Sequence, residues 1–139
     1  MEKRNLTLLT DLYELTMMNG YYLKGKADEV AVFDVFFRRK ELITYSLAAG
    51  LEQAVDYVLG LNFGEDEIAY LKSLNLFDEG FLNYLKDLKF SGDVYSVPEG
   101  TMVFPGEPIF TVKAPVIEAQ LIETAVLNII NHQTLIATK

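Results

Sequence analysis

Tyr13 lies on a helix face that a single protein core does not explain. The stretch TDLYELTM, residues 10–17, predicts the start of an amphipathic helix, which Thr10 or Asp11 can cap. A period of about 100° per residue places one apolar stripe on Leu12, Leu15, Met18 and Tyr22. Tyr13 falls on the opposite side, so its ring contacts either a second packing partner, such as another subunit, or a ligand. Asp11 is interpreted first as a cap, and as a binding residue only if a ligand lies near that helix end.

Arg38 and Arg39 are the second pair of side chains suited to a ligand. They end EVAVFDVFFRR, a stretch rich in β-branched and aromatic residues, and these residues 29–39 predict a strand with two apolar faces. Such a strand is expected inside a sheet that is covered on both sides. Adjacent arginines point to opposite faces, and the planar guanidinium suits a phosphate or a carboxylate. The alternative is a solvated strand end.

Other motifs predict structure and not chemistry. His132, the single histidine, lies in an apolar helix between Asn131 and Gln133 and is expected to be hydrogen-bonded in a packed interior. The run PEGTMVFPGEP has neither GxGxxG nor a Walker lysine, so it predicts turns and not a phosphate loop. Its hairpins loosely resemble those of biotinyl and lipoyl carrier domains. Lys113, the nearest lysine, is expected at the end of a strand instead of a hairpin tip, which argues against a carrier role.

Composition limits the class of protein. The 139 residues indicate one domain or a piece of a larger one, and a hydrophobic content of 50% is ample for a core. The net charge of -8 argues against nonspecific nucleic-acid binding and against docking to anionic membranes. One histidine and no cysteine argue against a zinc site, a Cys nucleophile or a complete Ser-His-Asp triad. The sequence shows no signal region or membrane-spanning stretch, so a cytoplasmic protein is expected.

The elements that must position these residues are helices around a small β-substructure. Short β-segments with sharp PEG and PGEP turns are expected from Ser91 onward. The last helix, about residues 115–139, is apolar nearly all round, which predicts burial on every side. Its pattern is still running at Lys139, so we expect the chain to be the N-terminal part of a longer protein. The other expected helices are Asp11–Leu23, Ala48 or Ala49 to Leu59, and two short ones within residues 64–74 and 78–90.

Five blocks, in this order and spacing, carry a resemblance to a known family. They are TDLYELTMMNGYY, VFDVFFRR, AAGLEQA, GDVYSVPEGTMVFPGEPIFTVKAP and ETAVLNIINHQTLIATK. Together they closely resemble the N-terminal portion of bacterial nicotinate phosphoribosyltransferase, over essentially the whole chain. The resemblance implies an α+β fold, in which residues 1–139 form the hammerhead-like N-terminal domain of a type II phosphoribosyltransferase. The final helix would lead into an irregular α/β barrel that is absent from this chain.

The resemblance also implies a reaction. Nicotinate attacks carbon 1 of phosphoribosyl pyrophosphate and gives nicotinate mononucleotide and pyrophosphate, coupled to ATP hydrolysis in NAD salvage. Mg²⁺ accompanies the pyrophosphate, and the transfer step needs no covalent nucleophile. In the full-length enzyme the substrates and ATP would bind largely outside this segment. We therefore expect no catalytic residue, metal ligand or cofactor site in this segment alone.

The resemblance assigns roles to four residues at an active site shared between the subunits of a homodimer. Tyr13 matches the tyrosine that stacks on the pyridine ring, and Asp11 matches an aspartate near the nicotinate site. Arg39 matches a basic residue that reaches phosphate in the partner's site, and Arg38 is the second candidate. The family's phosphorylated histidine belongs to the barrel, so its role is not transferred to His132.

Two alternatives remain open from the sequence. The chain could be a non-catalytic binding or interaction module that pairs with a full-length subunit. It could also belong to a related phosphoribosyltransferase acting on nicotinamide or quinolinate, although TDLYELTM and PEGTMVFPGEP favour nicotinate. We predict that the 139-residue chain alone has no transferase activity, and that its exposed last helix makes it prone to association.

Overall fold

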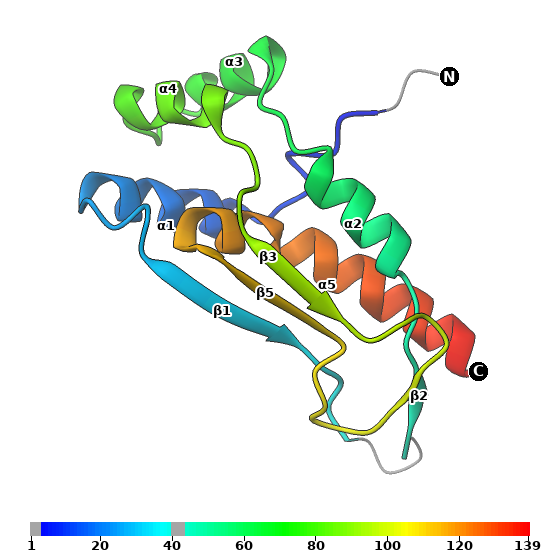
Figure 1. Cartoon of the computed structure of the whole chain (residues 1–139). Coiled ribbons are helices and arrows are strands. Elements are labelled where there is room, and N and C mark those ends of the chain that lie inside the picture. Colours follow the sequence, from blue (N-terminus) through cyan, green and yellow to red (C-terminus); the bar gives the residue numbers. More distant parts are fainter. Residues whose placement is uncertain (1–3, 40–43) are drawn as a thin grey trace.

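A small antiparallel sheet packs on the long C-terminal helix in the computed structural model, which describes residues 4–39 and 44–139 (Figure 1). The elements in chain order are α1 (Leu12–Leu23), β1 (Val30–Val35), β2 (Ser46–Leu47), α2 (Leu51–Leu59), α3 (Glu65–Ser73), α4 (Glu79–Asp87), β3 (Asp93–Ser96), β4 (Met102–Val103), β5 (Phe110–Pro115) and α5 (Val116–Thr138). This is the expected α+β class, and each predicted helix is present within a few residues of its expected bounds.

The long helix α5 organises the core. It packs against α1, α2, β1, β2 and β5, so segments from both ends of the sequence meet on it (Figure 1). Its N-terminal half contributes the fully buried side chains Ile117, Leu121 and Ile122. The expectation of burial on every side is wrong for its C-terminal half, where Leu135 is 41% and Ile136 is 61% exposed. The described residues therefore leave this half of the helix partly uncovered.

The sheet has the strand order β1-β5-β3, and both pairings are antiparallel. Along β5 the residues Phe110, Val112 and Ala114 are buried, because successive side chains of a strand alternate between its two faces. Lys113 lies on the opposite face inside β5, opposite Val32 of β1. The expectation that Lys113 ends a strand is therefore wrong, and the lysine is not at a hairpin tip either.

Strand β1 lies at an edge of this sheet, which contradicts the expectation of a strand covered on both faces. Among the described residues its only strand partner is β5. Val32 is 58% exposed and Phe33 is 37% exposed, so neither of its apolar faces is fully covered by this chain. The strand also ends at Val35, before the two arginines.

The proline and glycine motifs form turns, as expected. Gly100 and Gly106 have φ values of 79° and 87°, in the left-handed region that favours glycine. The turn at Gly100 docks on the start of α2, where its amide donates to the Ala48 carbonyl at 2.7 Å. The Glu99 carboxylate accepts from the Gly50 amide at 2.8 Å, so a protein side chain already satisfies this helix end.

Helices α3 and α4 form a pair beside α1 and serve as scaffold (Figure 1). Tyr22 of α1 packs on Phe81 and Tyr84 of α4, with ring centroids 5.9 and 5.4 Å apart. No helix in residues 4–39 and 44–139 is long and apolar enough to cross a membrane.

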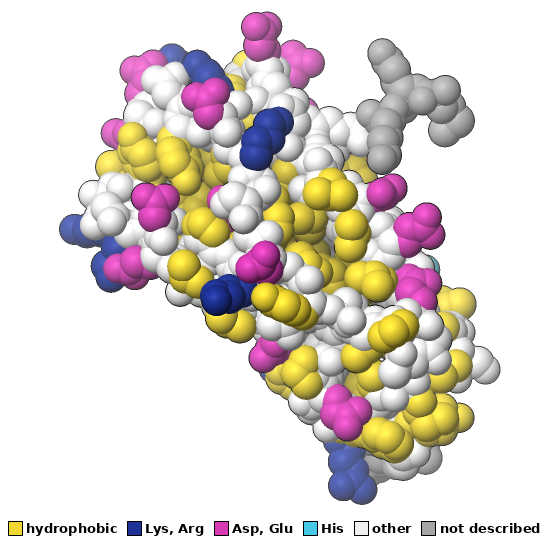
Figure 2. All heavy atoms as spheres, viewed as in Figure 1, with side chains coloured by type: hydrophobic (Ala, Val, Ile, Leu, Met, Phe, Trp, Pro, Cys, Tyr) yellow, Lys and Arg dark blue, Asp and Glu magenta, His cyan; other side chains and the backbone are white. Residues whose placement is uncertain are grey.

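Hydrophobic side chains remain exposed where β2, the turn between β4 and β5, and the end of α5 meet (Figures 1 and 2). Tyr45, Met102 and Phe104 are 44–53% exposed in this region. His132 of α5 is also exposed, so the expectation that it lies in a packed interior is wrong. His132 lies on a side of α5 that the described elements leave uncovered.

Candidate functional site

The start of α1 is held by side-chain contacts with α5. Asp11 occupies the N-cap position with extended backbone angles, but its carboxylate makes no capping hydrogen bond. That carboxylate instead accepts a hydrogen bond at 3.0 Å from the hydroxyl of Thr124 on α5. The Thr10 hydroxyl donates to the Glu14 carboxylate. The expectation that the Thr10 or Asp11 side chain caps this helix is therefore wrong.

Tyr13 stands on the exposed side of α1, as predicted, and 50% of it is accessible. Its hydroxyl lies 3.4 Å from Glu14 Oε1 and 3.5 Å from Glu123 Oε1 of α5. The phenol is thus held at its tip, while half of the residue is accessible to solvent. Tyr13 has this position because Leu15 and Met18, on the other side of the helix, are buried in the core.

Glu14 is the residue of this site that sequence reasoning missed. It is fully buried, whereas Leu12, predicted to belong to the apolar stripe, is 50% exposed. The buried face of α1 is therefore rotated towards Glu14. Its spacing of four residues from Met18 could have revealed this, since positions i and i+4 share a helix face. Its partners could not have been read from the local sequence, because the Thr124 hydroxyl donates to it from 110 residues away, at 2.8 Å.

Three carboxylates, from Asp11, Glu14 and Glu123, therefore gather between α1 and α5; we call them the carboxylate cluster. Burial first, and then the Glu14 and Asp11 charges, raise the pKa of Glu123, although hydrogen bonds from Tyr13 and Gln120 oppose the shift. Partial desolvation and the same three carboxylates raise the pKa of Tyr13. The site is thus an acidic, hydroxyl-rich support beneath an exposed aromatic ring.

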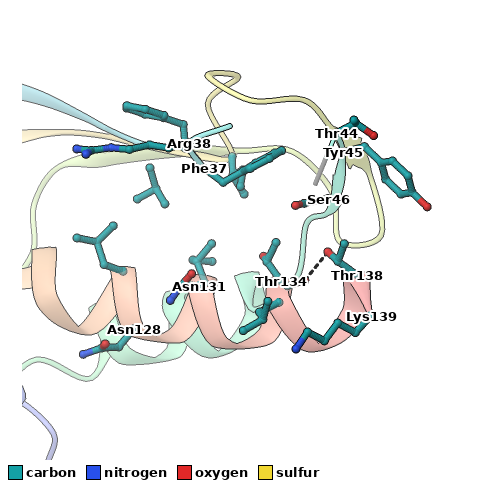
Figure 3. Close-up of a pocket in the computed structure, with 16 residues that line it drawn as sticks. Phe37, Arg38, Thr44, Tyr45, Ser46, Asn128, Asn131, Thr134, Thr138 and Lys139 are labelled. Carbon is teal, nitrogen blue, oxygen red and sulfur yellow. Dashed lines mark hydrogen bonds between the residues drawn. The ribbon is translucent and has the colours of Figure 1, made fainter. Parts of the chain in front are cut away.

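Arg38 lies at a different place, in a cavity of about 610 Å³ between the strands and the C-terminal half of α5. Figure 3 shows its side chain on the strand side of the cavity, with Asn128 and Asn131 on the helix side. Further along α5, the Thr138 hydroxyl donates to the Thr134 carbonyl at 2.6 Å (Figure 3). Arg39 is exposed and does not line this cavity.

One groove links the two parts of the candidate site. A second cavity, of about 410 Å³, lies between β1 and α5 and includes Glu123 in its lining. Val35, Phe36 and Leu127 line both cavities, so the two adjoin. The structure therefore brings Asp11 and Tyr13 together at one place, and puts Arg38 farther along the groove to which Glu123 belongs.

The carboxylate cluster does not have the arrangement of a metal site. Within the described ranges, no group of three or more His, Cys, Asp or Glu side chains is placed to hold a metal ion. Hydroxyls of Thr10, Tyr13 and Thr124 occupy the positions around the cluster instead.

Comparison with known proteins agrees with this architecture. The family model described as the nicotinate phosphoribosyltransferase (NAPRTase) N-terminal domain matches residues 8–131. Nicotinate phosphoribosyltransferase of Bacillus subtilis strain 168 is 46% identical over 136 residues, covering 97% of this chain and 28% of that protein. Nicotinate phosphoribosyltransferase pncB2 of Mycobacterium tuberculosis strain H37Rv is 44% identical over 133 residues, covering 95% of this chain and 28% of that protein.

A solved structure extends the likeness beyond bacteria. The crystal structure of human nicotinic acid phosphoribosyltransferase superposes with a TM-score of 0.86 at 35% sequence identity, over 94% of this chain and 27% of that one. The bacterial qualifier is therefore too narrow for the resemblance, while the α+β N-terminal fold is confirmed. The chain spans about a quarter of the length of these relatives. With the family model covering residues 8–131, this chain belongs to the family of nicotinate phosphoribosyltransferase N-terminal domains.

Proposed function

We propose that the protein containing this chain joins nicotinate to phosphoribosyl pyrophosphate, giving nicotinate mononucleotide and pyrophosphate with ATP hydrolysis, in NAD salvage. The observation that carries the proposal is the family match over residues 8–131, with relatives that are named nicotinate phosphoribosyltransferases. Those names favour nicotinate over nicotinamide or quinolinate as the substrate. Identities of 44% and 46% with two bacterial relatives, against 35% with the human protein, favour a bacterial source, and we propose a cytoplasmic location for the enzyme.

Tyr13 and Asp11 are proposed to contact the pyridine substrate. The half-exposed Tyr13 residue offers a ring on which a flat heteroaromatic ring can stack, and Asp11 lies two residues before it, at the same helix end. Because the ring faces the exterior of its own chain, the site is proposed to be completed by the barrel of a second subunit in a homodimer. Such contacts would hold the pyridine ring at the site and contribute mainly to the binding of nicotinate.

Arg39, with Arg38 as the second candidate, is proposed to bind phosphate of the sugar substrate. The cavity lining of Arg38, Asn128 and Asn131 supports an anion site, because guanidinium and amide groups both donate hydrogen bonds. Mg²⁺ and ATP are proposed to bind to the rest of the protein. Mg²⁺ would neutralise charge on the departing pyrophosphate, and this chain would supply orientation and phosphate contacts.

The test begins with the intact mass of the complete gene product, followed by an assay with nicotinate and phosphoribosyl pyrophosphate, with and without ATP. We expect a mass several-fold above 15.7 kDa and ATP-stimulated formation of nicotinate mononucleotide. Residues 1–139 alone should give no product. Faster turnover of nicotinamide or quinolinate than of nicotinate would assign that compound as the substrate. A gene product of 15.7 kDa without activity would favour an interaction module.

A matched pair of variants tests the role of Tyr13 in the complete protein. Tyr13→Ala should raise the KM for nicotinate roughly tenfold, since it removes a stacking surface. Tyr95→Ala, which truncates a tyrosine of β3 that is 59% exposed, should leave the KM unchanged. Equal KM values in both variants would contradict the stacking role.

A further inference from the structure

The hydroxyl of Thr124 joins two carboxylates of α1 to α5. It lies 3.0 Å from Asp11 Oδ2 and 2.8 Å from Glu14 Oε1. A threonine hydroxyl has one proton to donate, so the two carboxylate oxygens share it, and both lie within hydrogen-bond distance of one side chain. Because Asp11 and Glu14 flank Tyr13 in the sequence, this contact fixes the turn of helix that carries the tyrosine.

Glu14 is the centre of this arrangement. It is fully buried and accepts hydrogen bonds from hydroxyls of Thr10, Tyr13 and Thr124. In the part of the chain that the structure describes, no lysine or arginine makes an ion pair or hydrogen bond with it. Burying a carboxylate that lacks a cationic partner costs stability, and its hydrogen bonds offset this cost only while their geometry is kept. Such a group therefore enforces one orientation of α1 on α5.

The apolar contacts of α1 cannot enforce that orientation by themselves. Leu15 and Met18 are buried apolar side chains of α1. Apolar packing is not directional, so a small rotation about the helix axis would keep both side chains covered. Hydrogen bonds lose strength with small changes in distance and angle. The polar contacts with Thr124 are thus the ones that set the rotation of α1, and with it the direction of the Tyr13 ring.

The groups facing Glu14 come from three elements. Asp11 and Tyr13 belong to α1, and Glu123 belongs to α5, where the Gln120 amide donates to its carboxylate at 3.1 Å. From α2, Tyr57 faces the same charge, and burial followed by the Glu14 carboxylate raises the pKa of its phenol. The titratable side chains that face Glu14 are carboxylates and phenols and carry no positive charge, so threonine hydroxyls remain the main donors to it.

We propose that Thr124 and Glu14 are positioning residues, which hold Tyr13 and Asp11 in the orientation that binds the pyridine substrate. The inference rests on the proposed function for its substrate, but the geometry of Tyr13 can be measured without it. Neither residue contacts the substrate in this scheme. Their loss should therefore weaken nicotinate binding through Tyr13 and leave phosphate binding unchanged.

The first readout is kinetic and uses the complete protein. Thr124→Val keeps the shape of the side chain and removes the hydroxyl, so the KM for nicotinate should rise about tenfold while kcat stays within about twofold. Thr124→Ser retains the hydroxyl and should restore the KM. Thr111→Val is the matched control, because the Thr111 hydroxyl also donates to a carboxylate, that of Asp34 at 2.5 Å, but on the sheet.

The second readout observes Tyr13 directly and needs no activity. With 3-fluorotyrosine incorporated in the complete protein, the ¹⁹F resonance that Tyr13→Phe abolishes belongs to position 13. In Thr124→Val this resonance should move, and its titration should shift down towards the ordinary phenol pKa as the carboxylates move away. Thr124→Ser and Thr111→Val should leave both unchanged. If Thr124→Val does not fold, Thr124→Ala gives the same readouts.

The two readouts separate the inference from the proposed function. A complete protein that does not convert nicotinate refutes the function, and the Tyr13 resonance then decides the positioning role alone. A Tyr13 resonance and titration in Thr124→Val identical to those of the parent protein would overturn the inference. Active protein with an unchanged nicotinate KM in Thr124→Val would overturn it as well.

Discussion

At the scale of single residues, the acidic support beneath Tyr13 links stability to pH. The pKa of Glu123 is raised by burial and by the Glu14 charge, so the folded chain holds this proton more tightly than the unfolded chain does. The stability that protonated Glu123 contributes is complete below its ordinary pKa of about 4.3, and is lost as pH rises through the higher folded value. The folded domain therefore carries an unfavourable charge at neutral pH.

Replacing this carboxyl group should remove that dependence. Glu123→Gln is expected to match the parent chain in Tm near pH 4, and to exceed it by about 1–3 °C at pH 7, a small effect because the site is partly solvated. Thermal unfolding followed by circular dichroism at both pH values measures the difference. Glu52→Gln, at an exposed glutamate of α2, should show no such change with pH. A Tm difference that is the same at both pH values would contradict the linkage.

The residues of the site differ in how far the local sequence predicts their burial and contacts. Tyr13 was predicted on an exposed helix face because helical periodicity is a local property. The burial of Glu14 depends on its contact with Thr124 of α5, which lies 110 residues away in the sequence. Asp11 was expected to cap for the same reason, whereas its carboxylate turns to Thr124.

At the scale of elements, the packing of β3 on β5 depends on a glycine that no turn requires. A Cβ at Gly92 would lie 2.4 Å from Ala114 Cβ and 2.6 Å from the Lys113 carbonyl oxygen. Both contacts are far inside van der Waals distance, and one is with backbone that cannot rotate away. The close approach of the two strands therefore needs hydrogen at this position.

Gly92→Ala is predicted to lower the free energy of unfolding by about 1–3 kcal/mol, through overpacking. Gly20→Ala is the matched control, because a Cβ at Gly20 meets nothing within 4 Å and the residue lies inside α1. It should raise stability by about 0.5–1 kcal/mol, since alanine loses less backbone freedom in a helix. Urea unfolding of the three chains measures both signs. If Gly92→Ala and the parent chain have the same free energy of unfolding, β3 and β5 can move apart with little loss of stability.

The bounds of the helices could be predicted from the sequence, but the position of a strand within the sheet could not. Helical bounds follow from local period and stop signals, and they agree with the structure within a few residues. The position of β1 at a sheet edge follows from pairing with β5, about 80 residues later, and from the absence of a second strand partner in the described residues. No local pattern contains that information.

At the scale of the whole molecule, the sequence overestimates the burial of two elements, β1 and the C-terminal half of α5, and both line the same groove. β1 and the C-terminal half of α5 have sequences typical of covered elements, yet they line cavities that open to the exterior. Leu127 and Leu135 of α5 line this groove and are 42% and 41% exposed. The chain spans about a quarter of its relatives' length, and its described residues leave this apolar surface uncovered.

The open groove should therefore make residues 1–139 associate in isolation, because contiguous exposed apolar surface is covered by contact with another molecule. Sedimentation velocity over a range of concentrations should show self-association of the parent chain, and less of it in Leu127→Gln/Leu135→Gln. Leu59→Gln is the control, since Leu59 of α2 is 76% exposed but lies outside the groove. A chain that stays monomeric at all concentrations would mean that α5 and β1 tolerate water, and that their apolar sequences do not reflect a missing partner surface.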